Sequence, residues 1–284
     1  MSLKLKAAYW LRSALNVGQP RRCPCCGGTD LQVVDHKYIV TWLLECRQCH
    51  LRHRHPKDDP AWLERFYQKE YTVDTHMITK LPDAAAMERL KAEGFPDLRD
   101  ISPYIKALRP AGGRVLDYGC SWGYHVFKMR RAGLDAEGFE LSRPRAAFGQ
   151  RTLGVTIHSD PAAVNGRYDV ISSSHVIEHL ASIPDLVAFS RDHLVPGGLF
   201  MAFCPNGSDA YRRREPGLFH VNWGSLHPNY LDIPFARHLF RDVPHLILTG
   251  DWTYSTEELA AWDQRSQRVG AREDGKELLI IAAL

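Results

Sequence analysis

The sequence of 284 residues lacks long apolar runs, internal repeats and a strong net charge. No stretch approaches the roughly 18 to 20 consecutive apolar residues of a membrane span, which excludes an integral helical membrane protein. Residues 1–16 show no apolar block followed by a small-residue cleavage site, so we expect no secretory signal and a cytoplasmic location. A net charge of +3 is too small to indicate nucleic-acid binding by itself.

The composition is that of a globular protein. Apolar residues make up 44% of the chain and charged residues 24%, which excludes a disordered or fibrous protein. The length exceeds the ~150 residues typical of one domain and predicts a large α/β domain with an appendage. Residues 1–60 contain ten Lys or Arg and five Asp or Glu. This positive excess indicates either a solvated face or a docking surface for an anionic partner.

Five of the seven cysteines lie between positions 23 and 49. An odd total without a secretory signal does not indicate a disulfide scaffold, whereas metal binding fits a reducing compartment. Two C-x-x-C pairs are separated by nineteen residues, and each pair places two thiolates on one tight turn. The pattern predicts a zinc ribbon whose structural zinc ion is held by Cys23, Cys26, Cys46 and Cys49.

The residues around the two cysteine pairs complete the predicted ribbon. Two strands are predicted between the pairs, at 31–45, and Cys25 is the spare thiol. The alternative is a redox-active pair of cysteines, but the sequence around the cysteines does not show the βαβ pattern in which such pairs occur. His50, His53 and His55 are expected to be exposed polar residues, because four cysteines already fill a structural zinc site.

Short apolar strands alternate with helical stretches from Arg114 onward, which predicts a doubly wound sheet. Seven strands are predicted, at 114–118, 135–140, 155–158, 168–174, 198–204, 245–252 and 277–284. Helices are predicted at about 123–132, 143–152, 184–194, 229–240 and 256–268. The predicted domains are a zinc ribbon with an N-terminal helix at 1–60, a helical linker or lid at 61–110, and the sheet domain at 111–284.

A glycine-containing loop follows the first strand of the predicted sheet. The segment VLDYGCSWG runs from a buried strand through a turn into a helix, at the sheet edge where ligands bind. Glu140 ends the next strand, where an acid accepts hydrogen bonds from the ribose hydroxyls of a nucleoside cofactor. The dinucleotide fingerprint requires glycine at 119, 121 and 124, but this chain has Ser121 and Tyr124. NAD or FAD is therefore not favoured.

Four segments together resemble the successive motifs of class I S-adenosylmethionine-dependent methyltransferases: VLDYGCSWG, GFELS, YDVISSSHVIEHL and LVPGGLFMAFCPN. The resemblance covers about residues 100–284 and implies a Rossmann-like seven-stranded methyltransferase sheet with S-adenosylmethionine as the methyl donor. Ser121 departs from the second glycine of many members, which puts the loop geometry in doubt. The cofactor-binding residues implied by the resemblance are Asp117, Tyr118, Gly119, Gly123, Glu140, Leu141, Asp160 and His175.

The N-terminal segment resembles a subgroup of these enzymes. CPCCGG followed by CRQCHLRHRHPKDDPAWLERFYQKEY is similar to methyltransferases with an N-terminal zinc ribbon that act in sugar, polysaccharide or secondary-metabolite biosynthesis. The resemblance implies a small polar or saccharide acceptor.

The segment His175-Val-Ile-Glu178-His179 is the first candidate for catalysis. In a short helix the three polar residues share one face, and histidine is the natural general base for a hydroxyl acceptor. The segment is also similar to the E-x-x-E-H metal site of ubiquinone-pathway and small-RNA O-methyltransferases, with His175 replacing the first Glu. A second divalent metal at His175, Glu178 and His179 is therefore an alternative, and a purely structural turn is another.

A second polar cluster follows Asn206 and contains Arg212–Arg214, His220, Trp223 and His227. By resemblance this segment covers the acceptor, and either His220 or His227 is an alternative base. The sequence thus predicts O-methylation of a small polar or saccharide acceptor. Two alternatives remain: an rRNA or tRNA methyltransferase that docks RNA through the ribbon, and an inactive cofactor-binding or zinc-ribbon interaction protein. The sequence shows no stripe of aromatic and basic residues, and this absence counts against an RNA substrate.

Overall fold

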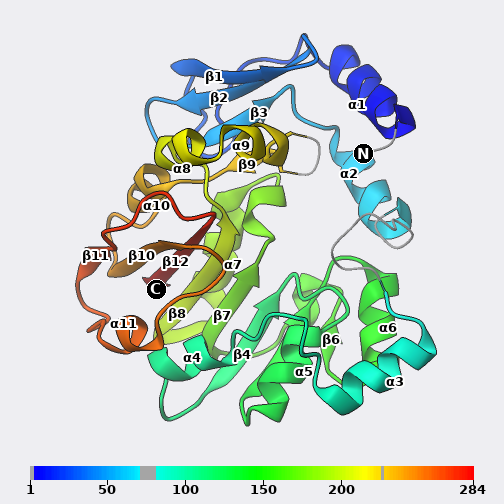
Figure 1. Cartoon of the computed structure of the whole chain (residues 1–284), viewed down its shortest axis with the longest axis vertical. Helices are drawn as coiled ribbons and strands as arrows, with labels where there is room; N and C mark the ends of the chain where they lie inside the picture. The colour runs from blue at the N-terminus through cyan, green and yellow to red at the C-terminus, as the bar shows by residue number, and fades with distance from the viewer. Residues whose placement is uncertain (1–2, 71–80, 225–226) are drawn as a thin grey trace.

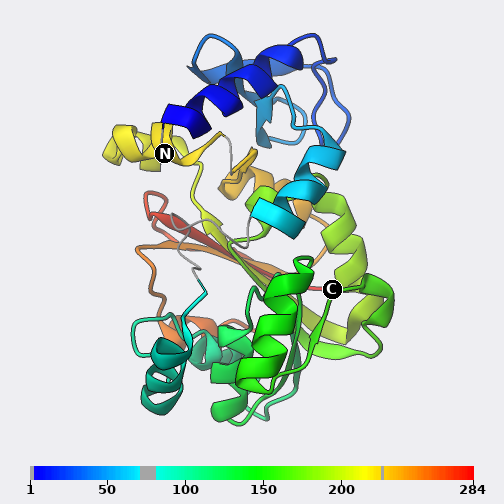
Figure 2. The ribbon, with the colours of Figure 1, turned by 90° about the vertical axis from the view of Figure 1, so that its right-hand side faces the viewer.

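Two β-sheets organise the chain in the computed structural model, which describes residues 3–70, 81–224 and 227–284. A four-stranded sheet lies in the N-terminal part, and an eight-stranded sheet occupies the rest (Figure 1). Seen from the side, the smaller sheet and α1 (Leu3–Leu15) lie stacked above the larger sheet (Figure 2). Nowhere in the described ranges is a helix both long and apolar enough to cross a membrane.

The N-terminal sheet begins as the hairpin that the sequence predicts. β1 (Leu31–Lys37) pairs antiparallel with β2 (Thr41–Cys46), and the tight connection places Tyr38 and Ile39 at positive φ. A further strand, β3 (Arg52–His55), pairs with β2 and was not predicted.

β3 overturns the expectation for two of the three histidines. His53 and His55 are only 1% and 3% exposed, so the prediction of exposed side chains is wrong for both. β3 lies between β2 and β9 (Asn229–Tyr230), and this central position buries all four of its residues. Burial lowers the pKa of His53 to about 4, so its imidazole is uncharged at neutral pH.

β9 comes from a distant part of the sequence and completes the N-terminal sheet by pairing with β3. The helix predicted at 229–240 starts later, as α10 (Ile233–Leu239), so the prediction is wrong for its first residues. Asp232 accepts a hydrogen bond from the backbone N–H of Phe235, and Pro234 occupies the first turn. This cap and this proline set the helix start and leave the preceding residues free to form a strand.

The larger sheet confirms the Rossmann-like fold class. Its order is β11-β10-β12-β8-β7-β4-β5-β6, mostly parallel, with β12 antiparallel to both of its neighbours. All seven predicted strands are present, as β4 (Arg114–Tyr118), β5 (Asp135–Phe139), β6 (Ile157–His158), β7 (Tyr168–Ser174), β8 (Leu194–Pro205), β10 (His245–Gly250) and β12 (Glu277–Ala283).

The structure adds a short eighth strand, β11 (Gln267–Val269), at one edge of this sheet. The helix predicted at 256–268 is correspondingly shorter, because α11 (Thr256–Ala260) ends at Ala260. Asp263 accepts hydrogen bonds from the backbone N–H groups of Arg265 and Ser266. These bonds close a turn at the point where the helix would have continued.

Helices cover both faces of the larger sheet, and each face has its own apolar core. One core includes residues of α4 (Ser102–Leu108), α5 (Tyr124–Arg131), α6 (Arg143–Leu153) and α11. The other includes residues of α7 (Ile183–His193) and α10. The remaining helices are α2 (Pro60–Arg65), α3 (Ala84–Glu93), α8 (Asp209–Arg214), α9 (Pro216–Asn222) and the short turns η1 (Phe66–Glu70), η2 (Pro161–Ala163) and η3 (Ile177–His179). Burial on both faces explains the nearly continuous apolar runs of the central strands.

Candidate functional site

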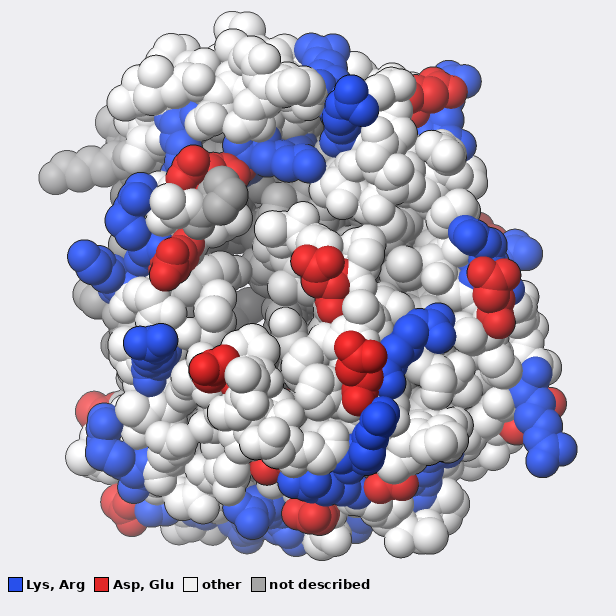
Figure 3. All heavy atoms as spheres, turned by 180° about the vertical axis from the view of Figure 1, so that it is seen from behind, with Lys and Arg blue, Asp and Glu red and all other residues white. Residues whose placement is uncertain are grey.

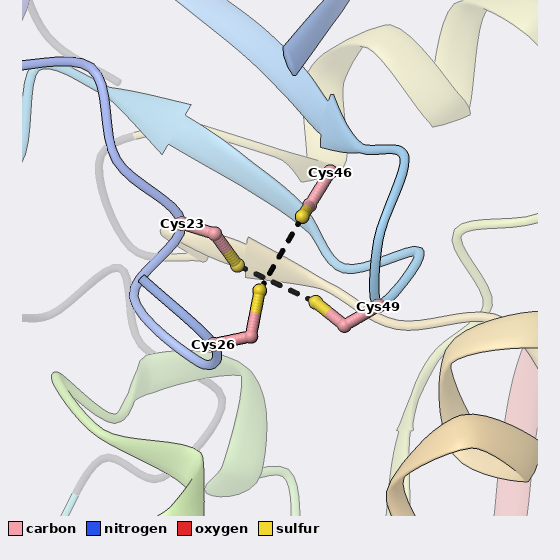
Figure 4. Close-up of side chains that lie close together, drawn as sticks. All are labelled: Cys23, Cys26, Cys46 and Cys49. Atoms are coloured by element: carbon pink, nitrogen blue, oxygen red, sulfur yellow. Dashed lines mark hydrogen bonds between the residues drawn. The ribbon is translucent and has the colours of Figure 1, made fainter. Parts of the chain in front are cut away.

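The four predicted zinc ligands converge at one end of the N-terminal sheet (Figure 4). The Sγ atoms of Cys23 and Cys49 are 3.4 Å apart, and those of Cys26 and Cys46 are 3.5 Å apart. All four sulfur atoms lie within 4.8 Å of one another. Zn–S bonds of ~2.3 Å in a tetrahedron require sulfur atoms roughly 3.8 Å apart, so the four thiols fit a closed zinc site.

The two cysteine turns have matching backbones. The N–H of Gly27 donates to the carbonyl of Cys23, and the N–H of His50 donates to the carbonyl of Cys46. Gly27 and His50 each come four residues after the first cysteine of their pair, and both have positive φ (74° and 67°). His50 therefore accepts a left-handed conformation that costs a non-glycine residue about 1 kcal/mol or more. This matched geometry is what places two thiols on each turn.

The glycine loop after β4 adopts the conformation that its sequence left in doubt. Gly119, Ser121 and Gly123 all have positive φ, with Ser121 at 53°. Ser121 thus takes the left-handed conformation of the glycine that it replaces, and its hydroxyl accepts a hydrogen bond from Arg145 at 2.9 Å. Gly119 cannot be replaced by a residue with a side chain in the same way, because a Cβ there would lie 2.3 Å from a methyl group of Val176.

Glu140 lies at the end of β5 directly beside this loop. Its two carboxylate oxygens accept hydrogen bonds from the backbone N–H groups of Ser121 at 2.8 Å and Ser142 at 2.7 Å. Burial raises the pKa of Glu140 above its ordinary value, against the opposing effect of these N–H groups. Each oxygen keeps a further lone pair for another donor, which fits a ribose hydroxyl.

The other implied cofactor residues surround the same edge of the sheet. Buried Asp117, at the end of β4, accepts a hydrogen bond from the hydroxyl of Ser172 at 2.9 Å. Exposed Leu141 follows Glu140, and exposed Asp160 caps the η2 turn beyond β6. Tyr118 instead packs its ring against Phe139 and Phe189, with centroids 4.9 and 5.2 Å away.

Several buried polar atoms around the loop have no hydrogen-bond partner among the described residues. They are Asp117 Oδ2, Trp122 Nε1, His125 Nε2 and Ser142 Oγ. Native structures leave few such atoms unpaired, since each costs on the order of 1–3 kcal/mol. Asp117 interacts electrostatically with Glu140, and Ser142 donates its backbone N–H to Glu140, so their unpaired atoms fit a polar nucleoside ligand at this edge.

His175 lies at the end of β7 between two buried carboxylates. Its Nε2 is 2.9 Å from Glu277 Oε1, and its Nδ1 is 3.2 Å from Glu178 Oε1. Burial opposes the charged ring, but the two carboxylates outweigh it and raise the pKa of His175 to about 9. Its backbone is also in the left-handed region, with φ at 55°. Such strain in a non-glycine residue is concentrated at functional sites.

Sequence reasoning missed three residues that complete this cluster. Arg99 Nη1 donates to Glu277 Oε1 at 2.6 Å, and the ring of Trp252 lies 5.4 Å from that of His175. Glu277 is fully buried at the first position of an otherwise apolar strand. One carboxylate opening an apolar run was the available signal for Glu277, whereas nothing local distinguishes Arg99 or Trp252. We call Arg99, His175, Glu178, Trp252 and Glu277 the His175 cluster.

His179 and His227 extend the His175 cluster on the side of Glu178. Potential ligand atoms of Glu178, His179 and His227 lie within 4.8 Å of one another, and the two imidazole rings have centroids 4.8 Å apart. His227 donates from Nδ1 to the carbonyl of Asn222 at 2.7 Å, so its Nε2 keeps a lone pair.

His220, the other predicted base, lies elsewhere. Its Nδ1 is 2.8 Å from Asp35 Oδ2 on β1, and Trp223 Nε1 donates to the same oxygen at 2.9 Å. The structure therefore brings His175, Glu178 and His179 together and places His220 against the N-terminal sheet.

The larger sheet and its glycine loop have the Rossmann-like arrangement of a methyltransferase domain. The chain belongs to the methyltransferase domain family, whose model matches residues 87–264. It is similar to the ubiquinone biosynthesis O-methyltransferase of Burkholderia multivorans, at 30% identity over 44% of this chain and 61% of the relative. The enzyme of the same name from Roseobacter denitrificans is 36% identical over 31% of this chain and 39% of its own length. The match thus spans about three fifths of the length of the Burkholderia relative and about two fifths of the length of the Roseobacter relative.

A solved structure supports the fold alone. The plantazolicin methyltransferase BpumL, in complex with a pentazolic desmethylPZN analog and S-adenosylhomocysteine, has a TM-score of 0.50 and 14% identity. The similarity covers 78% of this chain and 94% of that protein.

Proposed function

We propose that this methyltransferase transfers a methyl group to an oxygen of a small polar or saccharide acceptor, with a histidine general base from the segment His175–His179. Because the pKa of His175 is about 9, its base role requires the deprotonated ring, and transfer through His175 should rise with pH up to about 9. The observation that carries the proposal is a set of buried polar atoms without hydrogen-bond partners in the described ranges: Arg99 Nε and Nη2, Glu178 Oε2 and Glu277 Oε2. A polar acceptor that pairs with these atoms removes a cost on the order of 1–3 kcal/mol for each. The relatives named as O-methyltransferases support oxygen as the methylated atom.

We propose the following roles toward the methyl donor. Glu140 accepts hydrogen bonds from the ribose hydroxyls, and Asp160 and Leu141 lie on the adenine side. Asp117, Gly119 and Gly123 border the methionine part, and His175 lies beside the reacting group. When bound, the donor supplies an activated methyl group, so the protein contributes positioning and removal of the acceptor proton. The four thiolates of the N-terminal sheet hold a structural zinc ion, which leaves no open coordination position for catalysis.

A mixed surface supports a small acceptor over a polyanion. On the face seen from behind, Lys and Arg side chains are interspersed with Asp and Glu, and the diagonal run of Lys and Arg at the lower right is flanked by Asp and Glu (Figure 3). Phosphate neutralisation dominates RNA affinity, and acidic neighbours oppose it.

The test is single-turnover methyl transfer after a screen of hydroxylated saccharides, nucleotide-sugars and phenols with S-adenosylmethionine. We expect a product with one added methyl on oxygen. His175→Ala should slow transfer roughly 100-fold or more, whereas His220→Ala should stay near wild type. Affinity for S-adenosylhomocysteine, measured for each variant, separates lost chemistry from lost cofactor binding. A wild-type rate for His175→Ala, or methylation at nitrogen or carbon, would reject this assignment.

A divalent metal in the active site is the second candidate, favoured by the convergence of Glu178, His179 and His227. The sequence suggested His175, Glu178 and His179 as metal ligands, whereas in this arrangement His227 takes the place of His175. A metal there would lower the pKa of an acceptor hydroxyl. Elemental analysis should then find two metal ions per wild-type chain and one in His227→Ala. One metal ion in both proteins would leave only the cysteine site.

A further inference from the structure

A cavity of about 680 Å³ is lined by residues of the N-terminal sheet, α8 and α10. Figure 1 shows these elements next to one another. The walls of the cavity come from β2, β3, both helices and the segment before β12. None of its lining residues belongs to the glycine loop, to Glu140 or to the His175 cluster. The volume falls within the roughly 300–1,000 Å³ of small-molecule sites, so the cavity is large enough for a second ligand.

One face of α10 and its C-terminal extension is turned into this cavity. The residues concerned follow helical spacing and are Pro234, Arg237, His238 and Arg241. The intervening Phe235 and Ala236 are fully buried in the core on the other side. From across the cavity, α8 contributes Arg213, and the second cysteine turn contributes His50. Arginines from two separate elements therefore converge on one space.

Two arginines of this cavity have no ion-pair partner among the residues that the structure describes. In the described parts of the chain neither Arg213 nor Arg237 forms an ion pair, although the adjacent Arg214 pairs with Asp251 at 2.8 Å. Arg241 reaches only Asp242 at 3.4 Å, an exposed pair that is worth little.

The acidic residues of the lining are mostly engaged by a different cation. Glu45, Asp209 and Asp232 lie 2.7, 2.9 and 4.0 Å from the buried guanidinium of Arg52. Glu273 also lines the cavity, so the lining holds four arginines and four carboxylates, and Arg213 and Arg237 are the arginines among them that form no ion pair in the described residues. Guanidinium groups match the oxygens of phosphoryl groups in geometry and charge.

We propose that this cavity is a second ligand site that binds a phosphoryl group of a small molecule, with Arg213 and Arg237 as its principal contacts. The phosphoryl group belongs either to the methyl acceptor itself or to a separate phosphorylated effector. Both sources use the same arginine chemistry, and neither depends on which atom is methylated.

The experiment is isothermal titration calorimetry of inorganic pyrophosphate into the full-length protein saturated with S-adenosylhomocysteine. We expect saturable binding of one pyrophosphate per chain, weakened at least fivefold by Arg237→Gln and by Arg213→Gln. Arg151→Gln is the matched control, because Arg151 is also an exposed arginine in the last turn of a helix but lies outside the cavity. This variant should bind pyrophosphate as the wild type does.

Three results would overturn the proposal. They are no saturable binding to the wild type, an equal loss in Arg151→Gln, and displacement of S-adenosylhomocysteine by pyrophosphate, which would assign the anion to the cofactor site. A second arm identifies the source of the phosphoryl group. A higher KM of Arg237→Gln for a phosphorylated acceptor, with the KM for its dephosphorylated form unchanged, assigns the group to the acceptor. Noncompetitive modulation of the wild type by pyrophosphate, absent in Arg237→Gln, assigns it to an effector.

Discussion

The cysteine site and the His175 cluster are built from opposite kinds of sequence information. The cysteine site takes its four ligands from residues 23–49, on two turns with the same backbone geometry. The His175 cluster collects side chains between Arg99 and Glu277, from a loop, two strand ends and a short helical turn. A site made of local turns can be recognised from the spacing of its residues in the sequence. A site assembled by a sheet can be recognised only when the order of the strands is known.

The two regions are not independent. β9 ties the segment after β8 to the N-terminal sheet, and Arg52 of β3 donates to the carbonyl of Gly207 as well as to Asp209. The segment that by resemblance covers the acceptor is therefore joined to the part that carries the four-cysteine cluster. The following predictions test how far this coupling goes.

The largest effect is expected from removing a zinc ligand. Cys46→Ser should lose the zinc ion and lower the melting temperature by about 10 °C or more, because structural zinc contributes on the order of 10 kcal/mol in small zinc-binding domains. Elemental analysis and scanning calorimetry measure both effects. Cys25→Ser should keep the metal, since Cys25 is outside the four-cysteine group. Full zinc content in Cys46→Ser would contradict the ligand assignment.

Arg52 provides the next largest effect. Arg52→Ala should lower the free energy of unfolding by about 3 to 5 kcal/mol, because it leaves the carboxylates of Glu45 and Asp232 without their buried partner. Chemical denaturation measures the change. Arg268→Ala removes an exposed arginine 3.8 Å from Glu258 and should cost less than about 1 kcal/mol. Equal losses in the two variants would show that the coupling through Arg52 is unimportant.

The third prediction concerns Glu140, in the larger sheet, and the binding of the cofactor product. Glu140→Ala should weaken binding of S-adenosylhomocysteine at least tenfold, or about 1.4 kcal/mol, since the ribose loses its acceptor and two backbone N–H groups lose theirs. Calorimetric titration gives the affinity. Asp135→Ala, at the opposite and exposed end of the same strand, should bind normally. Unchanged affinity in Glu140→Ala would refute the ribose assignment.

The smallest effect concerns Asp35, where the N-terminal sheet touches His220 and Trp223. Burial opposes ionisation of Asp35, but hydrogen bonds from Trp223 and His220 outweigh it and hold its pKa below the ordinary value. Its contribution to stability is therefore present above pH ~4 and is lost as the pH falls through the lowered folded-state pKa. Trp223→Phe should raise the pKa of Asp35 and reduce stability at neutral pH by about 1 kcal/mol. Denaturation at pH 7 and at low pH measures the difference, which should shrink on acidification; a difference independent of pH would point to packing alone.

Much of the fold was predictable because its signals are local. Strands β4 and β7 match their predicted bounds, since each has a pair of buried apolar residues at its centre, Val115 and Leu116 in β4 and Val170 and Ile171 in β7. β3 was missed because Arg-His-Arg-His carries no apolar pattern; only its place between β2 and β9 buries it. The start of α10 was misplaced because the pairing partner of Asn229 and Tyr230 lies more than 170 residues earlier in the chain.

The sequence alone determined the four-cysteine cluster, the strand alternation and the glycine loop with its acid, since each depends on residue type at short spacing. Tertiary structure decided the rest. It brought Glu277 and Arg99 to His175, put His227 beside Glu178, and turned His220 toward Asp35. Which side chains meet across a sheet depends on strand order and register, and those follow from burying the whole apolar surface at once.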